Sequence, residues 1–202
     1  MVDNFALIRK HLRFKNKRSF YFVQILKRKK ENPELKSYSI PVESFYIFNK
    51  KDFDKYKKHI IRKCEENRAR AYIKMNCLDA QSVALKTISL LTETIRKENW
   101  HEMSSRFNSA CGECGKQDGL DALWLIDLDG ELAEKRNEVR GFINAQQPID
   151  VKEKVVMEVP TKNGYHFLTT GFDPREFSKK YPGVDRHKDG ITLLYFPKCC
   201  DE

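Results

Sequence analysis

Two carboxylates stand two residues apart at the end of a short apolar run, in residues 124–130 (WLIDLDG). In an extended strand, residues i and i+2 point to the same face, so Asp127 and Asp129 would project together. Carboxylates this close raise each other's pKa unless a cation lies between them. Mg²⁺ favours such an oxygen pair, usually completed by water and substrate phosphates. The spacing therefore indicates a divalent-metal site, with a strand end that runs into an Asp-Gly turn as the alternative.

Positive charge is concentrated near the start of the chain. Residues 1–30 contain ten lysines and arginines against one acidic residue, Asp3, an excess equal to the net charge of +9 of the whole chain. Aromatic residues lie among these cations, and the two kinds of side chain suit the phosphates and the bases of a nucleic acid. A solvated basic face over an aromatic core is the alternative. The residues expected to bind nucleic acid are Arg13, Lys15, Lys27, Arg28, Lys29 and Lys30.

The chain contains six cysteines and begins without the apolar core of a signal peptide. We therefore expect free thiols and a cytoplasmic location, in the host cytoplasm if a phage encodes the protein. No apolar run reaches the length of a bilayer, so no membrane partner is expected. Cys111 and Cys114 have the spacing of half a structural zinc site, which His101 or the pair Cys199 and Cys200 would have to complete. Incidental thiols in a glycine-rich loop are the alternative.

The apolar pattern predicts the elements that position these groups. Strands are expected where aromatic and β-branched residues cluster, and helices where apolar residues recur every three or four positions. The expected strands are 20–27, 44–49, 70–76, 124–129, 154–159, 165–170 and 191–196. The expected helices are 52–67, 79–95, 99–110, 131–145 and 174–181, with a glycine-rich loop at 111–119 and a hairpin turn at 162–164.

The mixed order of these elements predicts an α+β fold, with a largely antiparallel sheet backed by helices and an N-terminal αβ lobe. We expect residues 1–50 to form a basic extension and residues 51–202 a compact core. The helix that Asp79 caps has an apolar side that we expect to face the core. Its members are Ala84, Ile88, Leu91 and Ile95.

Three motifs occur in a fixed order. Residues 125–129 (LIDLD) carry the Asp-x-Asp pair, and residues 161–168 (TKNGYHFL) place a histidine on a strand after a basic, glycine-containing turn. Residues 184–195 (VDRHKDGITLLY) place an acidic residue before the last strand. Together with residues 70–76 (RAYIKMN), they resemble the archaeo-eukaryotic primase superfamily, which includes primase small subunits, primase-polymerases and the polymerase domains of bacterial end-joining ligases. The resemblance covers residues 70–197 and is closest to a small, phage-type member.

The resemblance implies an RRM-like catalytic core that performs metal-dependent nucleotidyl transfer on a nucleic-acid template or primer. Asp127, Asp129 and Asp185, with Asp189 as the alternative third acid, would bind Mg²⁺ or Mn²⁺ in catalysis. His166 would join them as a catalytic residue that contacts the nucleotide. The implied partners are nucleic acid, nucleoside triphosphates and a replication protein. The residues implied around the phosphates are Lys162, Asn163, Gly164, His166, Lys188 and Arg70.

Tyr165 departs from the superfamily pattern, which has a small residue near the histidine. Two other functions are compatible with the same fold. One is a metal-dependent nuclease, in which water replaces the sugar hydroxyl as the nucleophile. The other is a nucleic-acid-binding protein that has lost catalysis. Nucleotide incorporation, strand shortening and salt-sensitive binding without either activity distinguish the three.

Overall fold

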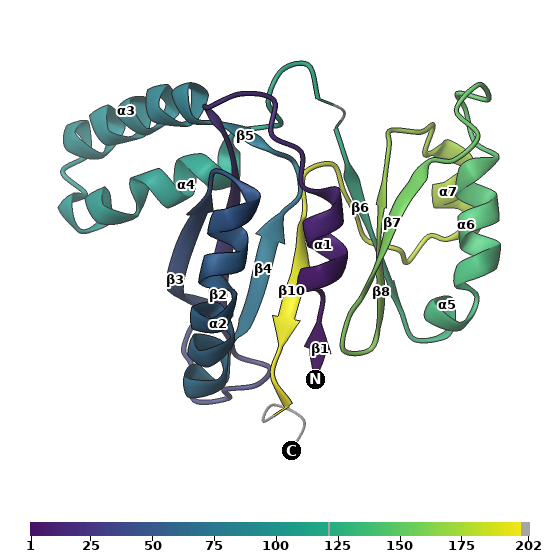
Figure 1. The fold of residues 1–202 in the computed structure, drawn as a ribbon, viewed down its shortest axis with the longest axis horizontal. Coiled ribbons are helices and arrows are strands. Elements are labelled where there is room, and N and C mark those ends of the chain that lie inside the picture. Colours follow the sequence, from purple (N-terminus) through teal and green to yellow (C-terminus); the bar gives the residue numbers. More distant parts are fainter. Residues whose placement is uncertain (121, 199–202) are drawn as a thin grey trace.

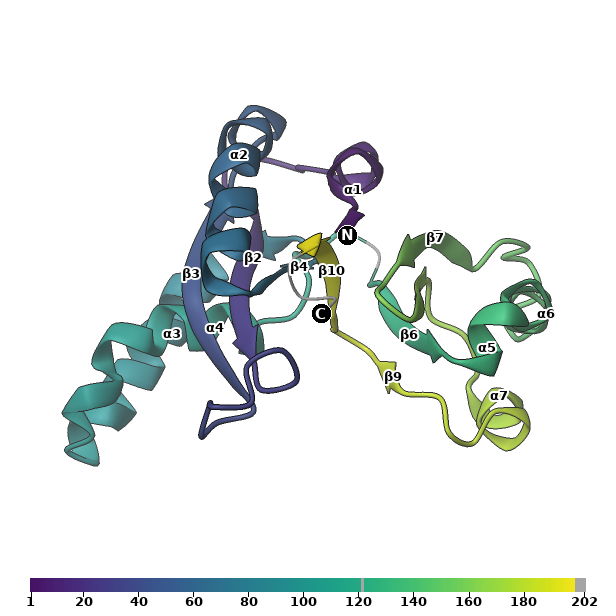
Figure 2. The same cartoon turned by 90° about the horizontal axis from the view of Figure 1, so that it is seen from below.

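A computed structural model describes residues 1–120 and 122–198, whose strands form two antiparallel sheets (Figure 1). The first sheet has the strand order β1 (Val2–Asp3), β10 (Ile191–Phe196), β4 (Arg70–Lys74), β2 (Ser19–Arg28) and β3 (Ser39–Ile47), with β5 (Leu78–Asp79) paired to β2. The second sheet has the order β7 (Val155–Pro160), β8 (Gly164–Thr169), β6 (Trp124–Asp129) and β9 (Arg186–His187). From β9 the chain returns to β10, so the last strand of the first sheet follows directly on the second sheet (Figure 2).

Helices accompany each sheet. Around the first sheet lie α1 (Phe5–His11), α2 (Lys50–Asn67), α3 (Ala80–Arg96), the 3₁₀ helix η1 (Trp100–Ser105) and α4 (Arg106–Glu113). Beside the second sheet lie α5 (Glu131–Glu134), α6 (Arg136–Asn144) and α7 (Arg175–Lys180). In the described part of the chain, no helix has the length and apolar character needed to cross a membrane.

The long strand β2 shows how the sequence builds the core on both faces of the first sheet. Val23 and Ile25 are buried in the same cluster as residues of α1 and α2. The alternate residues point to the opposite face because side chains alternate along a strand. There, Phe20 and Phe22 pack with α3 and α4 at one end of the strand. Toward the other end, Arg28 on this face lines an open cleft.

The α+β class, with antiparallel sheets and backing helices, is confirmed, although the strands divide between two sheets. The strands of residues 1–50 pair with β4 and β10, so the first sheet crosses the boundary expected at residue 50. The helix α4 extends to Glu113, so the glycine-rich loop expected from residue 111 begins later.

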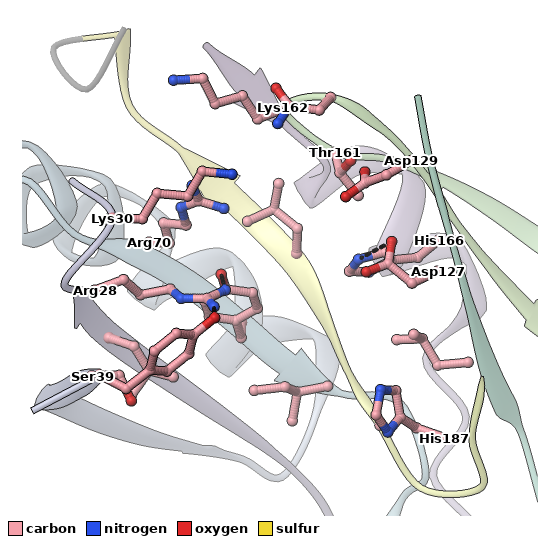
Figure 3. Close-up of a pocket in the computed structure, with 18 of the residues that line it drawn as sticks. Arg28, Lys30, Ser39, Arg70, Asp127, Asp129, Thr161, Lys162, His166 and His187 are labelled. Carbon is pink, nitrogen blue, oxygen red and sulfur yellow. Dashed lines mark hydrogen bonds and ion pairs between the residues drawn. The ribbon is translucent and has the colours of Figure 1, made fainter. Parts of the chain in front are cut away.

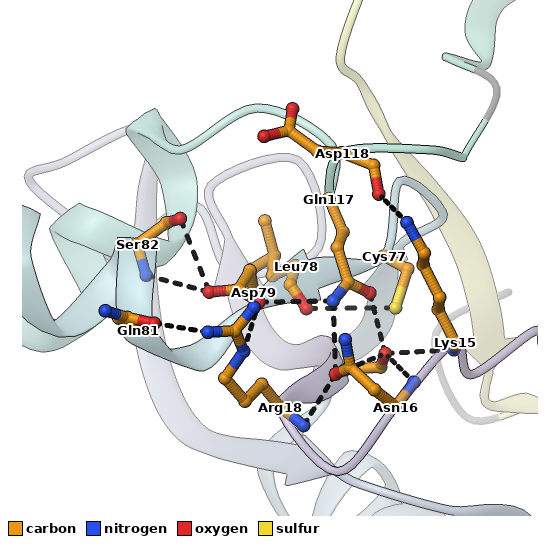
Figure 4. A network of polar contacts seen from close by, with 11 residues as sticks. Lys15, Asn16, Arg18, Cys77, Leu78, Asp79, Gln81, Ser82, Gln117 and Asp118 are labelled. Carbon is orange, nitrogen blue, oxygen red and sulfur yellow. Dashed lines mark hydrogen bonds and ion pairs between the residues drawn. The ribbon is translucent and has the colours of Figure 1, made fainter.

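Helix α3 begins where expected but presents a different side to the core. The Asp79 carboxylate accepts the Ser82 backbone N–H, 3.0 Å away (Figure 4). The expected core-facing side is wrong, because Ile88 is 60% and Ile95 is 50% exposed. The inward side has the same spacing shifted by one position: Val83, Thr87, Leu90 and Thr94.

Two threonines hide that inward side in the sequence. The hydroxyls of Thr87 and Thr94 each donate to the backbone carbonyl four residues earlier, at 2.8 Å. A threonine satisfied in this way brings its methyl group into the core without an unpaired polar atom. Residue type alone therefore favoured the neighbouring, fully apolar side.

Candidate functional site

A cleft of about 640 Å³ opens between the two sheets. One wall comes from the first sheet and the turn after β2, and it carries Arg28, Lys30 and Arg70. The opposite wall comes from the second sheet and carries the acidic residues Asp127 and Asp129 and two histidines, His166 and His187 (Figure 3). A polyanion with a bound cation matches these two walls, because phosphates suit the basic side and a metal suits the acidic side.

The acidic wall is positioned by the pairing of β6 with β8. In this antiparallel register, Asp127 lies opposite His166 and Asp129 opposite Gly164. Both carboxylates line the cleft, whereas Leu128 between them is buried in the core of the second sheet. Strand alternation thus places the two carboxylates side by side on the cleft face.

The Asp127 carboxylate is held in an environment that disfavours its charge. Burial first, and then the charges of Asp129 and Asp185, raise its pKa from 3.8 to about 6. Within residues 1–120 and 122–198, its buried Oδ1 atom has no hydrogen-bond partner. The nearby His166 Nε2 lies 3.5 Å from Oδ1. A divalent cation at this position would offset both the repulsion and the missing contact.

His166 is a neutral side chain at pH 7. Burial, with a smaller contribution from His187, lowers its pKa to about 4. Its Nδ1 atom lies 2.9 Å from the hydroxyl of Thr192 on β10, which links the two sheets. The pKa values of His166 and Asp127 move in the directions opposite to those of an ion pair, because burial disfavours the charged form of each group. His166 therefore offers the cleft a hydrogen-bonding imidazole without adding positive charge.

The two candidates for a third acid have different surroundings. The Asp185 carbonyl accepts the Asp127 N–H at 3.0 Å, and the Asp185 charge contributes to the raised pKa of Asp127. Asp189 lines the cleft, but Lys74 Nζ lies 2.7 Å from its Oδ2 and Asn76 Nδ2 donates to its Oδ1 at 2.8 Å. In the described ranges, no group of three or more His, Cys, Asp or Glu side chains is arranged to hold a metal ion. The described acidic wall thus offers a carboxylate pair.

The basic wall is fixed by aromatic and acidic neighbours. Arg28 donates to the hydroxyl of Tyr72 at 3.0 Å and to that of Tyr38. Arg70 forms an ion pair with Glu31, and its guanidinium lies 4.7 Å from the ring centroid of Phe196. Because these contacts hold both guanidinium groups in place, little side-chain entropy is lost when an anion binds.

The expected nucleic-acid-binding residues divide into two groups. Arg28 and Lys30 line the cleft, whereas the other four are not among its described lining residues. Lys15 Nζ donates to the Asp118 carbonyl at 2.9 Å (Figure 4), and Lys27 pairs with Glu34 at 3.3 Å. Arg13 donates to the Lys10 carbonyl at 2.8 Å and Lys29 is exposed.

The expected phosphate-binding residues also divide. Lys162 and Asn163 line the cleft beside Arg70 and His166. Lys188 instead lies with its ammonium group 5.5 Å from the ring centroid of Trp124. We expected the turn at Gly164 to leave backbone amides available for phosphates, but the Gly164 N–H donates to Thr161 Oγ1 at 3.0 Å. That amide is already used within the turn.

Gly164 is required for a different reason, which gives a first prediction. A Cβ atom here would overlap the backbone carbonyl oxygen of Leu128 and lie 3.0 Å from Asp129 Oδ1. We expect Gly164→Ala to lower the free energy of unfolding by about 1–3 kcal/mol and to displace Asp129. Urea denaturation measures the effect. The control is Gly183→Ala, where a Cβ meets nothing within 4 Å, and an equal loss in both variants would contradict this explanation.

The cysteine pair is not among the described residues that line the cleft. Cys111 and Cys114 are free thiols at the end of α4, and burial raises the pKa of Cys111 to about 12. Their backbone carbonyls accept hydrogen bonds from the buried Lys74 ammonium at 3.1 and 2.7 Å. Of the other proposed ligands, Cys199 and Cys200 lie outside the described residues, and His101 is exposed on η1.

Three residues at the site were not predicted from the sequence. Tyr38 lies in a polar stretch, and Thr192 contacts His166 only because β10 and β8 approach each other in space. Tyr72 had a weak signal, because alternation along a strand places it on the same face as Arg70.

Comparisons with protein-family models, with curated proteins and with solved structures gave no significant match. The resemblance to the primase superfamily therefore stays a prediction from the motifs. A functional assignment for this protein therefore rests on the geometry of the cleft.

Proposed function

We propose that this protein is a metal-dependent nucleotidyltransferase of primase-polymerase type that acts on a nucleic-acid template or primer. The observation that supports this most is the pairing, across one cleft, of the Asp127 and Asp129 carboxylates with the basic wall of Arg28, Lys30 and Arg70. A triphosphate with a divalent cation would bring its phosphates to one wall and its metal to the other.

The residues present fit a magnesium or manganese ion. Mg²⁺ is commonly held by one or two carboxylates together with substrate phosphates, rather than by a complete protein cage. Asp127 and Asp129 would supply this pair, with the charge of Asp185 nearby, and the unpartnered Asp127 Oδ1 suits a cation. When bound, the metal would activate the attacking hydroxyl and stabilise the leaving pyrophosphate.

The protein's own side chains would orient the nucleotide. Arg28, Lys30 and Arg70 would neutralise phosphate charge, and the planar guanidinium groups can bind phosphate oxygens through two N–H groups. The neutral His166, which lies on the acidic wall, would hydrogen-bond to a phosphate oxygen of the nucleotide. Lys162 lines the same cleft and would add positive charge there.

Incorporation of a labelled nucleotide into a primed template tests this function. We expect wild-type protein with Mn²⁺ to extend the primer, and Asp127→Ala and Asp129→Ala to lose extension, whereas Asp150→Asn, at an exposed site, keeps it. Shortening of the strand without incorporation would assign a nuclease instead. Salt-sensitive binding with neither activity, unaffected by Asp127→Ala, would assign a binding protein.

The basic wall gives a second prediction. Lys30→Glu is expected to weaken binding of a single-stranded oligonucleotide about tenfold at low salt. The slope of the logarithm of the binding constant against the logarithm of the salt concentration should fall by about one. Lys29→Glu makes the same charge change one residue away, at an exposed residue outside the described lining of the cleft, and should have a smaller effect. Fluorescence anisotropy across a salt series measures both, and equal losses would rule out a specific role for the cleft.

A further inference from the structure

Tyr38 is an aromatic residue that is unusually open to solvent for its position. Its side chain is 72% exposed, although it lines the cleft that holds the acidic pair. Most aromatic residues of the first sheet, among them Phe20, Phe22 and Phe45, are buried. Packing of the core therefore does not account for a large ring at this position.

The ring is held in place by the neighbouring strand. Arg28 lies with its guanidinium carbon 4.8 Å from the centroid of the Tyr38 ring and also hydrogen-bonds to the Tyr38 hydroxyl. The Lys29 N–H donates to the Tyr38 carbonyl at 2.9 Å, next to the β2–β3 pair of Arg28 and Ser39. One face of the ring is thus covered by a cation, and the high exposure leaves the ring accessible from the cleft side.

Arg28 is itself anchored deeper in the cleft. Its guanidinium donates to the hydroxyl of Tyr72 at 3.0 Å, and Tyr72 is buried. The contact therefore connects the exposed Tyr38 ring through Arg28 to the sheet. A ring with this support is pre-ordered, so that a partner stacking on it loses less free energy in ordering the protein.

We propose that Tyr38, supported by Arg28, is a stacking subsite for a nucleobase of single-stranded nucleic acid entering the cleft. Aromatic rings beside positive charge bind single strands in this way, because every base has a π-face and every nucleotide a phosphate. Lys30 and Arg70 line the same cleft and supply that charge. The subsite rests on the proposed function for its place on a template or primer strand, and it accepts any of the four bases.

Binding of two oligonucleotides of equal length and charge tests the subsite. One carries bases, and the other is abasic at every position. Without metal, we expect Tyr38→Ala to weaken binding of the base-bearing strand about tenfold and to leave the abasic strand unchanged. Tyr38→Phe keeps the ring and should retain most of the affinity. Equal losses for both strands, or no loss for either, would overturn the proposal.

Two further measurements make the test sharper. One asks whether the stacked base belongs to a strand or to a nucleoside triphosphate, and the other tests the subsite separately from the proposed enzyme activity. A loss of nucleoside triphosphate affinity in Tyr38→Ala with unchanged binding of the base-bearing strand would overturn the assignment to the strand. Because the strand-binding assay contains no metal, its result is independent of turnover. A Tyr38-dependent preference for the base-bearing strand in a protein that incorporates no nucleotide would support the subsite and contradict the enzyme. Unchanged melting temperature in Tyr38→Ala confirms that the variant is folded.

Discussion

Asp127→Asn is expected to raise thermal stability at pH 7.5 while it abolishes metal-dependent nucleotide binding. The folded protein raises the pKa of this carboxyl from 3.8 to about 6, chiefly through burial and then through Asp129 and Asp185. Such a group costs stability wherever it is ionised in the folded state, which is above about pH 6, and the cost vanishes below its unfolded pKa. The neutral amide removes that cost and also removes a metal ligand.

The gain in stability expected for Asp127→Asn is reduced because the Asp127 side chain is partly exposed to solvent. The Asp127 side chain is 35% exposed, so solvent screening reduces the linkage free energy to about 1–2 kcal/mol at pH 7.5. For a chain of this size, that corresponds to a rise of about 2–8 °C in melting temperature. Differential scanning fluorimetry at pH 7.5 and pH 4 measures it, with Asp150→Asn as the control.

Metal provides an independent readout of the same residue. Mn²⁺ should raise the melting temperature of the wild type but not that of Asp127→Asn, and its effect on the wild type should fade as the pH drops through about 6. A lower melting temperature for the variant at pH 7.5, or an equal gain at pH 4, would contradict the assigned environment.

Lys74→Met is expected to produce the largest loss of stability. The Lys74 ammonium is buried and donates to the carbonyls of Cys111, Gly112 and Cys114 at 2.7–3.1 Å. It also lies 2.7 Å from the Asp189 carboxylate. Methionine fills the space but leaves a carboxylate and the end of α4 without their cation, at a cost of about 3–5 kcal/mol.

A double variant separates the two parts of this cost. Lys74→Met with Asp189→Asn should recover part of the loss, because it removes the carboxylate that the single variant leaves unpaired. Urea denaturation measures both. A loss below about 1 kcal/mol for Lys74→Met would mean that the buried ammonium is not needed to hold this network. Because Asp189 lines the cleft, we also expect weaker nucleotide binding in the single variant.

The parts of the site that local patterns determine could be predicted from the sequence. Alternation in β6 placed Asp127 and Asp129 on one face, and the turn at residues 162–164 placed β8 beside β7. Alternation decides which side chains share a face, and it depends on neighbouring residues alone. The same holds for the start of α3 at Asp79, where a side-chain cap is a local signal.

The parts that depend on long-range packing could not be predicted. Strand alternation separates Arg28 and Lys30 from Lys27 and Lys29, but only the position of the second sheet decides which of the two pairs faces the cleft. Lys74 would count as a surface residue by type, yet α4 and Asp189 surround it. The inward side of α3 was missed because Thr94 satisfies its hydroxyl within the helix.

Calorimetric titration with Mn²⁺ and a nucleoside triphosphate tests the central claim most directly. The wild type and an Asp127→Ala/Asp129→Ala variant would be titrated with the triphosphate, each with and without Mn²⁺. We predict that the wild type binds the triphosphate only when Mn²⁺ is present, and that the variant binds it in neither condition. Failure of the wild type to bind, or equal binding by the variant, would contradict a metal-dependent nucleotide site in this cleft.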